Sequence, residues 1–158
     1  MELRELFLKQ KEAVRKRTRT IFPLLPRERV TWAPVEGALP LGHLLRHVWH
    51  SETGVRELLL HDRWDYYERR IPEGLFAILG EPKSIDEEVA KLEQVHSETM
   101  LQIAKMPPDL MDREFTNEQF SFRRKGYAIL FGIIEHEVHH RAQLLTYLRM
   151  LGIAGPGP

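Results

Sequence analysis

The sequence predicts an all-α fold, a single-domain bundle of four long helices over residues 1–158. Apolar residues recur with a period of about 3.6 in four long segments, and prolines and glycines gather between those segments. With 158 residues, of which 42% are hydrophobic, the chain is long enough to bury one core. The four helical segments are 2–22, 41–60, 85–106 and 126–151.

The first predicted helix, 2–22, is apolar on one face and ends before Pro23. Its basic run, 15–19, lies near the helix C-terminus, where cations are favourable, so we expect a solvated outer face there. The segment 27–40 has no hydrophobic period and is expected to be a loop. Within this loop, Trp32 is expected either to line a pocket or to cap the core.

Pro40 suits the first position of the second predicted helix, 41–60, because its fixed φ angle matches a helix. This helix contains three histidines, His43, His47 and His50, spaced by four and three residues. His47 lies nearest the centre of the apolar face, and the other two lie nearer its edge. We therefore expect His47 to face the core and the other two to lie beside it or at the surface.

A long connection, 61–83, separates the second helix from the third. Its mixed pattern of aromatic residues, prolines and glycines predicts short helical pieces, and long crossovers of this kind occur in helix bundles. Ser84 followed by Glu87 matches a capping box, so the third helix, 85–106, is expected to begin directly after Ser84. His96 lies near its apolar face and is expected to hydrogen-bond inward rather than to bind a metal.

The last predicted helix, 126–151, follows a polar segment, 109–125, in which phenylalanines alternate weakly with polar residues. That alternation predicts a short hairpin or a lid. The helix itself is apolar on two sides, so it needs a second partner besides the bundle. We therefore expect a homodimer. The apolar residues opposite the histidines of this helix are Ile134, Val138 and Leu145.

Three histidines, His136, His139 and His140, lie within the last predicted helix. His136 and His140 are four residues apart and share a face, which Gln143 and Tyr147 continue, whereas His139 lies at its edge. Two imidazoles at this spacing can bind one metal ion. Because the same face also carries apolar residues, the sequence predicts a metal site in the core.

His47 is the natural third ligand of this site. The chain has no cysteine, so any metal must be held by nitrogen and oxygen atoms. Three neutral histidines leave a divalent ion with positive charge and an open coordination position, which is typical of a catalytic site. Zinc, nickel, copper and iron all suit three imidazoles, and we expect zinc or nickel.

Residues 136–140 also match H-E-x-x-H, the zinc protease motif in which Glu137 would act as the general base. Those proteases take their third ligand from beyond the motif. This chain has no histidine, aspartate or glutamate after His140. The sequence therefore disfavours a protease.

Charge and hydropathy argue against two classes of partner. The chain has 23 basic and 23 acidic residues and thus no overall field that would attract nucleic acid or an anionic membrane. No apolar run reaches the ~18–20 residues that span a bilayer, and the first residues lack the apolar core of a signal peptide. We therefore expect a cytoplasmic protein with a small-molecule substrate.

Three segments resemble the DinB-like (DinB/YfiT) superfamily: LLRH at 44–47 with Glu52 after it, HEVHHRAQ at 136–143, and LRMLG at 148–152. Ala142 stands where the family motif has glycine, a small departure because alanine favours a helix. The resemblance implies an up-down-down-up four-helix bundle with a long crossover connection, commonly dimeric. It also implies a metal held by His47, His136 and His140.

The resemblance further implies an activity, because relatives include bacillithiol S-transferases and mycothiol-dependent maleylpyruvate isomerase. The leading hypothesis is a metal-dependent transferase or isomerase that directs a low-molecular-weight thiol at an electrophilic small molecule. Two alternatives stay open: a small-molecule hydrolase that uses a metal-activated water, and a non-catalytic dimer that binds a metal or another ligand. Candidates to line the substrate pocket or to contact the metal ligands are Trp32, His43, His50, His139, Gln143 and Tyr147.

Overall fold

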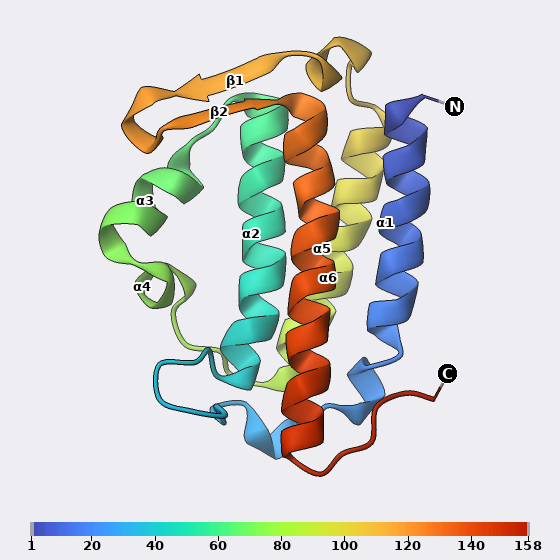
Figure 1. Cartoon of the computed structure of the whole chain (residues 1–158), viewed down its shortest axis with the longest axis vertical. Coiled ribbons are helices and arrows are strands. Elements are labelled where there is room, and N and C mark those ends of the chain that lie inside the picture. Colours follow the sequence, from blue (N-terminus) through green and yellow to red (C-terminus); the bar gives the residue numbers. More distant parts are fainter. Residues whose placement is uncertain (1, 158) are drawn as a thin grey trace.

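Four long helices form a bundle in the computed structural model, which describes residues 2–157 (Figure 1). Helix α2 packs against both α5 and α6, and α1 closes the bundle against the same two helices. In Figure 1, α1 and α6 run in one direction and α2 and α5 in the other. The order is therefore up-down-down-up, as expected. The long helices are α1 (Leu3–Arg19), α2 (Leu41–His61), α5 (Ile85–Ala104) and α6 (Gly126–Met150).

The ends of these helices follow local sequence signals. Ser84 is the N-cap of α5, and its Oγ accepts a hydrogen bond of 3.2 Å from the backbone N–H of Glu87. Pro40 is the N-cap of α2 rather than its first helical residue. The prediction for α1 was too long, because α1 ends at Arg19 and the chain continues as two 3₁₀ turns, Phe22–Leu24 and Arg27–Arg29. Pro23 forms part of the first of these turns.

Two short helices, α3 (Asp65–Glu73) and α4 (Leu75–Leu79), form the predicted crossover. They return the chain to the end of the bundle where α2 began, so α2 and α5 run parallel (Figure 1). Helix α3 docks where α2 has a glycine: a Cβ at Gly54 would lie 2.4 Å from Cγ of Tyr66. The absence of a side chain at Gly54 therefore lets the Tyr66 ring pack directly on α2.

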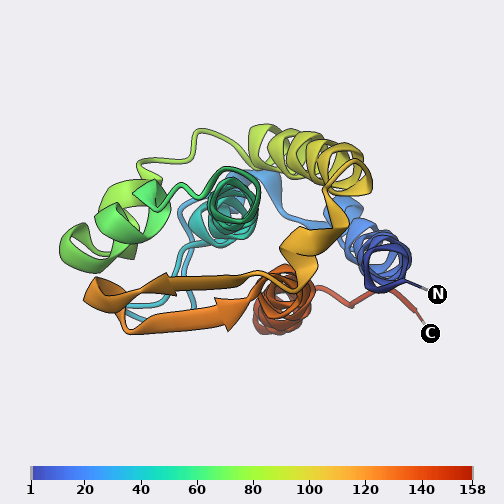
Figure 2. The same ribbon diagram turned by 90° about the horizontal axis from the view of Figure 1, so that it is seen from above.

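The predicted hairpin also forms. Strands β1 (Glu114–Asn117) and β2 (Phe122–Lys125) pair antiparallel between a 3₁₀ turn at Pro108–Met111 and the start of α6, with a further turn at Glu118–Phe120 between them. Figure 2 shows the hairpin and α3 on the same side of the bundle. Their aromatic residues meet there, with the rings of Trp64 and Phe122 edge to face at 5.1 Å between centroids.

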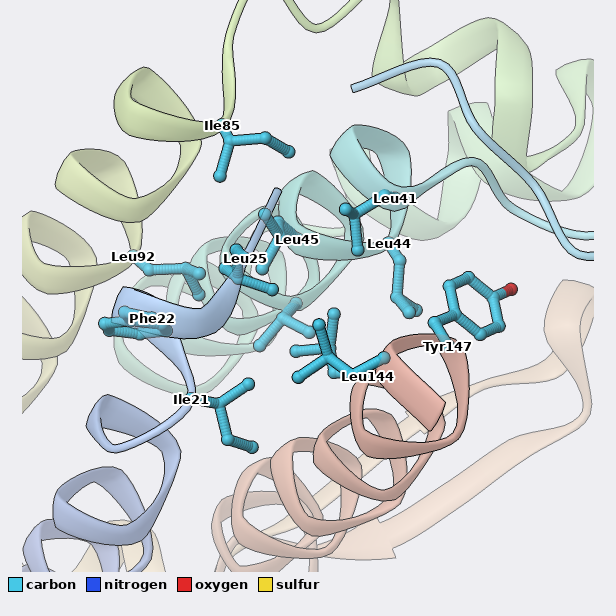
Figure 3. Packing of buried hydrophobic residues seen from close by; sticks show 12 residues of the cluster. Ile21, Phe22, Leu25, Leu41, Leu44, Leu45, Ile85, Leu92, Leu144 and Tyr147 are labelled. Atoms are coloured by element: carbon cyan, nitrogen blue, oxygen red, sulfur yellow. The ribbon is translucent and has the colours of Figure 1, made fainter. Parts of the chain in front are cut away.

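The core of the bundle consists of two apolar clusters, one toward each end. One joins α2, α5, α6 and the α1–α2 connection through residues such as Leu44, Leu92 and Leu144 (Figure 3). The other contains Phe7 and Leu130. A third, smaller cluster lies in the crossover and contains Tyr66, Ile78 and Leu79.

On α1, α5 and α6, buried polar residues lie in the sequence between residues of the first two clusters. Contacts with His47 and Glu52 of α2 join them into a polar layer across the bundle. The residues of this layer include Lys11, Arg15, His47, Glu52, His96, Glu137 and His140.

The outer side of α6 remains partly apolar. Val138 is 38% exposed, and Ile134 and Leu145 are partly buried against the two core clusters. The homodimer expected from this face stays a prediction. No helix within residues 2–157 combines the length and apolar character that crossing a bilayer requires.

Candidate metal centre

Helices α2 and α6 bring three imidazoles together in the polar layer. His136 and His140 lie one turn apart on α6, and His47 faces them from α2. The Nε2 of His136 lies 3.1 Å from that of His47 and 3.0 Å from that of His140. A tetrahedral zinc ion with Zn–N bonds of about 2.0–2.1 Å separates its nitrogen ligands by about 3.3 Å. The three histidines are therefore spaced as ligands of one ion.

Hydrogen bonds on the far side of two of these rings orient them. The Nδ1–H of His140 donates to Oε1 of Gln143 at 2.6 Å. Nδ1 of His47 lies 3.1 Å from Oγ of Ser51, which in turn lies 2.8 Å from the hydroxyl of Tyr66. Partners of this kind fix the tautomer of a ligand histidine and leave Nε2 free to bind a metal.

All three ligand candidates are held neutral. Burial, with a smaller contribution from neighbouring cationic charge, lowers the pKa of His47 to about 3 and that of His136 to about 2. Burial also lowers the pKa of His140. Neutral imidazole is the form that binds metals, and burying it as a cation would be costly. The cluster is therefore ready to accept a cation at neutral pH.

Glu137 follows His136 in the chain but belongs to a different cluster. Its carboxylate accepts hydrogen bonds from Lys11 Nζ at 2.5 Å and Thr18 Oγ1 at 2.7 Å, and Arg15 Nε lies 2.9 Å away. Burial alone would raise the pKa of Glu137, but the charges of Lys11 and Arg15 lower it to about 2. Because Glu137 is engaged by α1, it is not available as the general base of an H-E-x-x-H protease.

This buried cluster corrects one expectation. The run 15–19 was predicted to be a solvated face, yet Arg15 and Thr18 are buried against α6. Lys11 also binds Glu52 of α2, with Nζ 2.8 Å from Oε2. Two cations thus meet two carboxylates, which makes the burial tolerable. A sequence signal existed, because positions 7, 11, 15 and 18 follow one helical stripe that begins with a core phenylalanine.

A pocket of about 170 Å³ lies beside His136. Helices α2 and α6 of the bundle form two of its walls. Helix α3 of the crossover and strand β2 of the hairpin form the others. The polar residues that α3 and β2 contribute to this pocket were not among the predicted site residues. Its polar and aromatic lining consists of Ser51, Glu52, Tyr66, Tyr67, Arg70, Phe122, Arg124 and His136.

The remaining histidines lie outside the three-histidine cluster. His43 is buried, with Nε2 3.8 Å from a carboxylate oxygen of Glu81. His50 packs against Trp49, with 5.7 Å between ring centroids. His139 is exposed on α6, and its ring packs edge to face on that of His140, with 4.8 Å between centroids.

Three further candidates lie elsewhere on the bundle. The Nε2–H of His96 donates a 2.7 Å hydrogen bond to Oε2 of Glu12 on α1, and His96 itself is buried. Trp32 packs edge to face on Tyr147, with 5.6 Å between ring centroids. The hydroxyl of Tyr147 donates to the carbonyl oxygen of Leu39 at 3.0 Å. Trp32 and Tyr147 thus pack in the core and do not line the pocket beside His136.

Fold and site together define a four-helix-bundle protein with a candidate three-histidine metal site between two antiparallel helices. The sequence model of the DinB superfamily matches residues 10–144. The chain therefore belongs to the DinB superfamily. No curated protein matches the sequence.

Solved structures share the fold. A DinB-like protein, YjoA, from Bacillus subtilis superposes with a TM-score of 0.74 at 16% identity, over 96% of each chain. A DinB-like protein from Bacillus cereus gives 0.72 at 18% identity, over 98% of this chain and 96% of its own. YfiT from Bacillus subtilis gives 0.72 at 12% identity, over 96% and 89%. YfiT is described as a probable metal-dependent hydrolase with an unusual four-helix bundle topology.

Proposed function

We propose that this protein is a metal-dependent enzyme that acts on a small molecule in the pocket beside His136. The observation that carries the proposal is the convergence of three neutral Nε2 atoms, with neighbouring pairs 3.0–3.1 Å apart. The donor set fits a divalent ion of borderline softness, zinc or nickel, because it contains three imidazoles and no thiolate. His47, His136 and His140 are the proposed ligands.

The chemistry that such an ion supplies when bound is to lower the pKa of a coordinated thiol or water, which gives a nucleophile at neutral pH. This chain contains no cysteine, so a thiol nucleophile would come from a small cofactor. We therefore propose a transferase or isomerase that uses a low-molecular-weight thiol of the bacillithiol type. The residues around the pocket would exclude water from the electrophile and orient it.

A hydrolase is the second candidate. The description of YfiT as a probable metal-dependent hydrolase favours it, since YfiT shares this fold. In a hydrolase, water would replace the thiol as nucleophile and no cofactor would be needed. The same three ligands would serve both reactions, so the two candidates differ in whether turnover requires an added thiol.

The test uses zinc-loaded and nickel-loaded protein with bacillithiol or cysteine and a fluorogenic electrophile such as monochlorobimane, beside ester and amide substrates without thiol. We expect thiol conjugation faster than the uncatalysed reaction, and we expect His136→Ala to abolish the acceleration. Turnover of the ester or amide substrates without thiol would contradict the transferase proposal and support the hydrolase. Metal-loaded protein that catalyses neither reaction would leave a binding protein and contradict the enzyme proposal.

We also propose a homodimer in which the outer side of α6 faces a second copy. The support is the exposed Val138 on a helix that is already packed on its other sides. Sedimentation at micromolar concentration is expected to show a dimer that Val138→Glu dissociates. A wild-type protein that sediments as a monomer would contradict this proposal.

A further inference from the structure

Two arginines from separate elements line the pocket beside His136. Arg70 comes from α3 and Arg124 from β2. On α3, Arg70 lies four residues after Tyr66 and three after Tyr67, so all three share the face that lines the pocket. Arg69 lies on another face and pairs with Glu73, 3.3 Å away. Helical geometry thus directs one of two adjacent arginines to the pocket and the other away from it.

The hairpin repeats this arrangement. Arg124 pairs across the strands with Phe115, which is buried, and residues directly opposite each other lie on the same face of a sheet. Arg124 therefore points toward the body of the protein. Arg123 points to the other face, where its Nε lies 2.8 Å from a carboxylate oxygen of Glu114. Again one arginine lines the pocket, and its sequence neighbour lies on the other face and pairs with a carboxylate.

The two arginines at the pocket have no acidic partner. Within residues 2–157, neither Arg70 nor Arg124 forms an ion pair with a carboxylate. Each instead lies 5.8 Å from the centre of an aromatic ring, Tyr66 for Arg70 and Phe122 for Arg124. Both guanidinium groups also act electrostatically on the hydroxyl of Tyr67. Two positive charges without a paired carboxylate therefore lie at a pocket that also has three aromatic rings in its walls. The one carboxylate in the lining, Glu52, is paired with Lys11 on the other side, 2.8 Å away.

We propose that this pocket binds a small organic anion, a carboxylate or a phosphate on an apolar body. The inference rests on the proposed function, since the anion would be the substrate or thiol cofactor of the metal centre. Arg70 and Arg124 hold the anionic group, because guanidinium matches both oxyanions in charge and hydrogen-bond geometry. The rings of Tyr66, Tyr67 and Phe122 pack on the apolar body. A volume of about 170 Å³ suits a small molecule.

Binding is measured by calorimetry with three probes of similar shape: benzoate, phenyl phosphate and the neutral benzamide. Each probe is titrated into zinc-loaded and metal-free protein, because an oxyanion can also bind a metal directly. We expect at least one anion to bind about tenfold more tightly than benzamide in both forms. The stronger of the two anions then identifies the ligand as a carboxylate or a phosphate.

Variants separate the pocket arginines from general surface charge. Arg70→Gln and Arg124→Gln are each expected to weaken anion binding about tenfold. The matched controls Arg69→Gln and Arg123→Gln remove the same charge one residue away and are expected to leave affinity within about twofold of wild type. All four side chains are exposed, so the variants are expected to fold.

Three results would overturn the anion pocket: benzamide binding as well as both anions, no anion binding at millimolar concentration, or equal losses in all four variants. Elemental analysis of the same samples reports on the metal centre independently. If metal is absent while affinity depends on Arg70 and Arg124, the proposed enzyme fails and the anion pocket stands. If metal is bound but anion affinity does not depend on Arg70 and Arg124, the anion pocket fails and the metal centre stands.

Discussion

The carboxylate of Glu137 lies 2.5 Å from Nζ of Lys11, although the preceding residue, His136, faces His47 on another side of the same helix. The segment of α6 around residues 136 and 137 therefore has two structural roles. One side of the helix presents histidines to α2, and another anchors α6 to α1 through buried charges. The two roles make different predictions for neighbouring residues.

Glu137→Gln is expected to lower the free energy of unfolding by about 3–5 kcal/mol, because it leaves Lys11 and Arg15 buried with one carboxylate fewer. Urea unfolding measures the change. Glu135→Gln on the same helix is the control, since Glu135 is exposed, and it is expected to have little effect. The folded variant should still bind metal. Normal stability with lost metal would instead place Glu137 in the metal site.

The difference in unfolding free energy between wild type and Glu137→Gln is expected to depend on pH. The pKa of Glu137 is about 2 in the folded protein, against an ordinary value of 4.5 that applies after unfolding. As pH falls, the unfolded chain takes up the proton first, so the stabilisation by this carboxylate is complete above about pH 5 and declines toward pH 2. The stability difference between wild type and Glu137→Gln should therefore shrink over this range in metal-free protein. A constant difference would contradict the ion cluster.

Ser51→Ala is expected to weaken zinc binding by about 10–100-fold, because it breaks the chain from Tyr66 to Nδ1 of His47 that orients this ligand. Competition with a chromophoric chelator measures the affinity. Thr53→Ala is the matched control, since the Thr53 hydroxyl bonds only to the backbone of its own helix, at Trp49. Equal affinities in the two variants would show that Ser51 does not position His47.

Replacing glycine by alanine is expected to change the free energy of unfolding in opposite directions at two positions of α6, Gly126 and Gly132. A Cβ at Gly126 would lie 1.8 Å from the carbonyl oxygen of Leu110, so Gly126→Ala must displace the turn before the hairpin. We expect a loss of about 1–3 kcal/mol in unfolding free energy. A Cβ at Gly132 would meet no atom within 4 Å apart from its chain neighbours and the backbone of its own helix, and Gly132→Ala should gain about 0.5–1 kcal/mol from helix propensity. Thermal unfolding of both variants checks the signs, and equal signs would contradict the packing at Leu110.

Local patterns were sufficient to predict the helices, the crossover pieces and the hairpin, because each depends on periodicity or on caps and breaks in the sequence itself. His136 and His140 were predictable for the same reason, since their spacing alone places them on one face. His47 followed from its central position on an apolar face. These inferences needed no knowledge of which helices are neighbours.

The rest depended on contacts between distant segments. Arg15 was misplaced because charged residues are rarely buried unless paired, and its partner Glu137 is 122 residues away in the chain. Ser51 contacts Tyr66 only because α3 docks at a glycine of α2. Arg70 and Arg124 become one feature only after the crossover and the hairpin meet on the same side of the bundle. Periodicity in one segment carries no information about such pairings.

The most direct test of the account is the metal content of untagged protein, purified without nickel and reconstituted with zinc, for wild type, His136→Ala and His139→Ala. His139 is the matched control because it is an exposed histidine on the same helix. We expect close to one ion per chain in wild type and in His139→Ala, and loss of the ion in His136→Ala. Wild-type protein that stays empty with zinc and with nickel, or equal metal in all three proteins, would contradict the three-histidine centre.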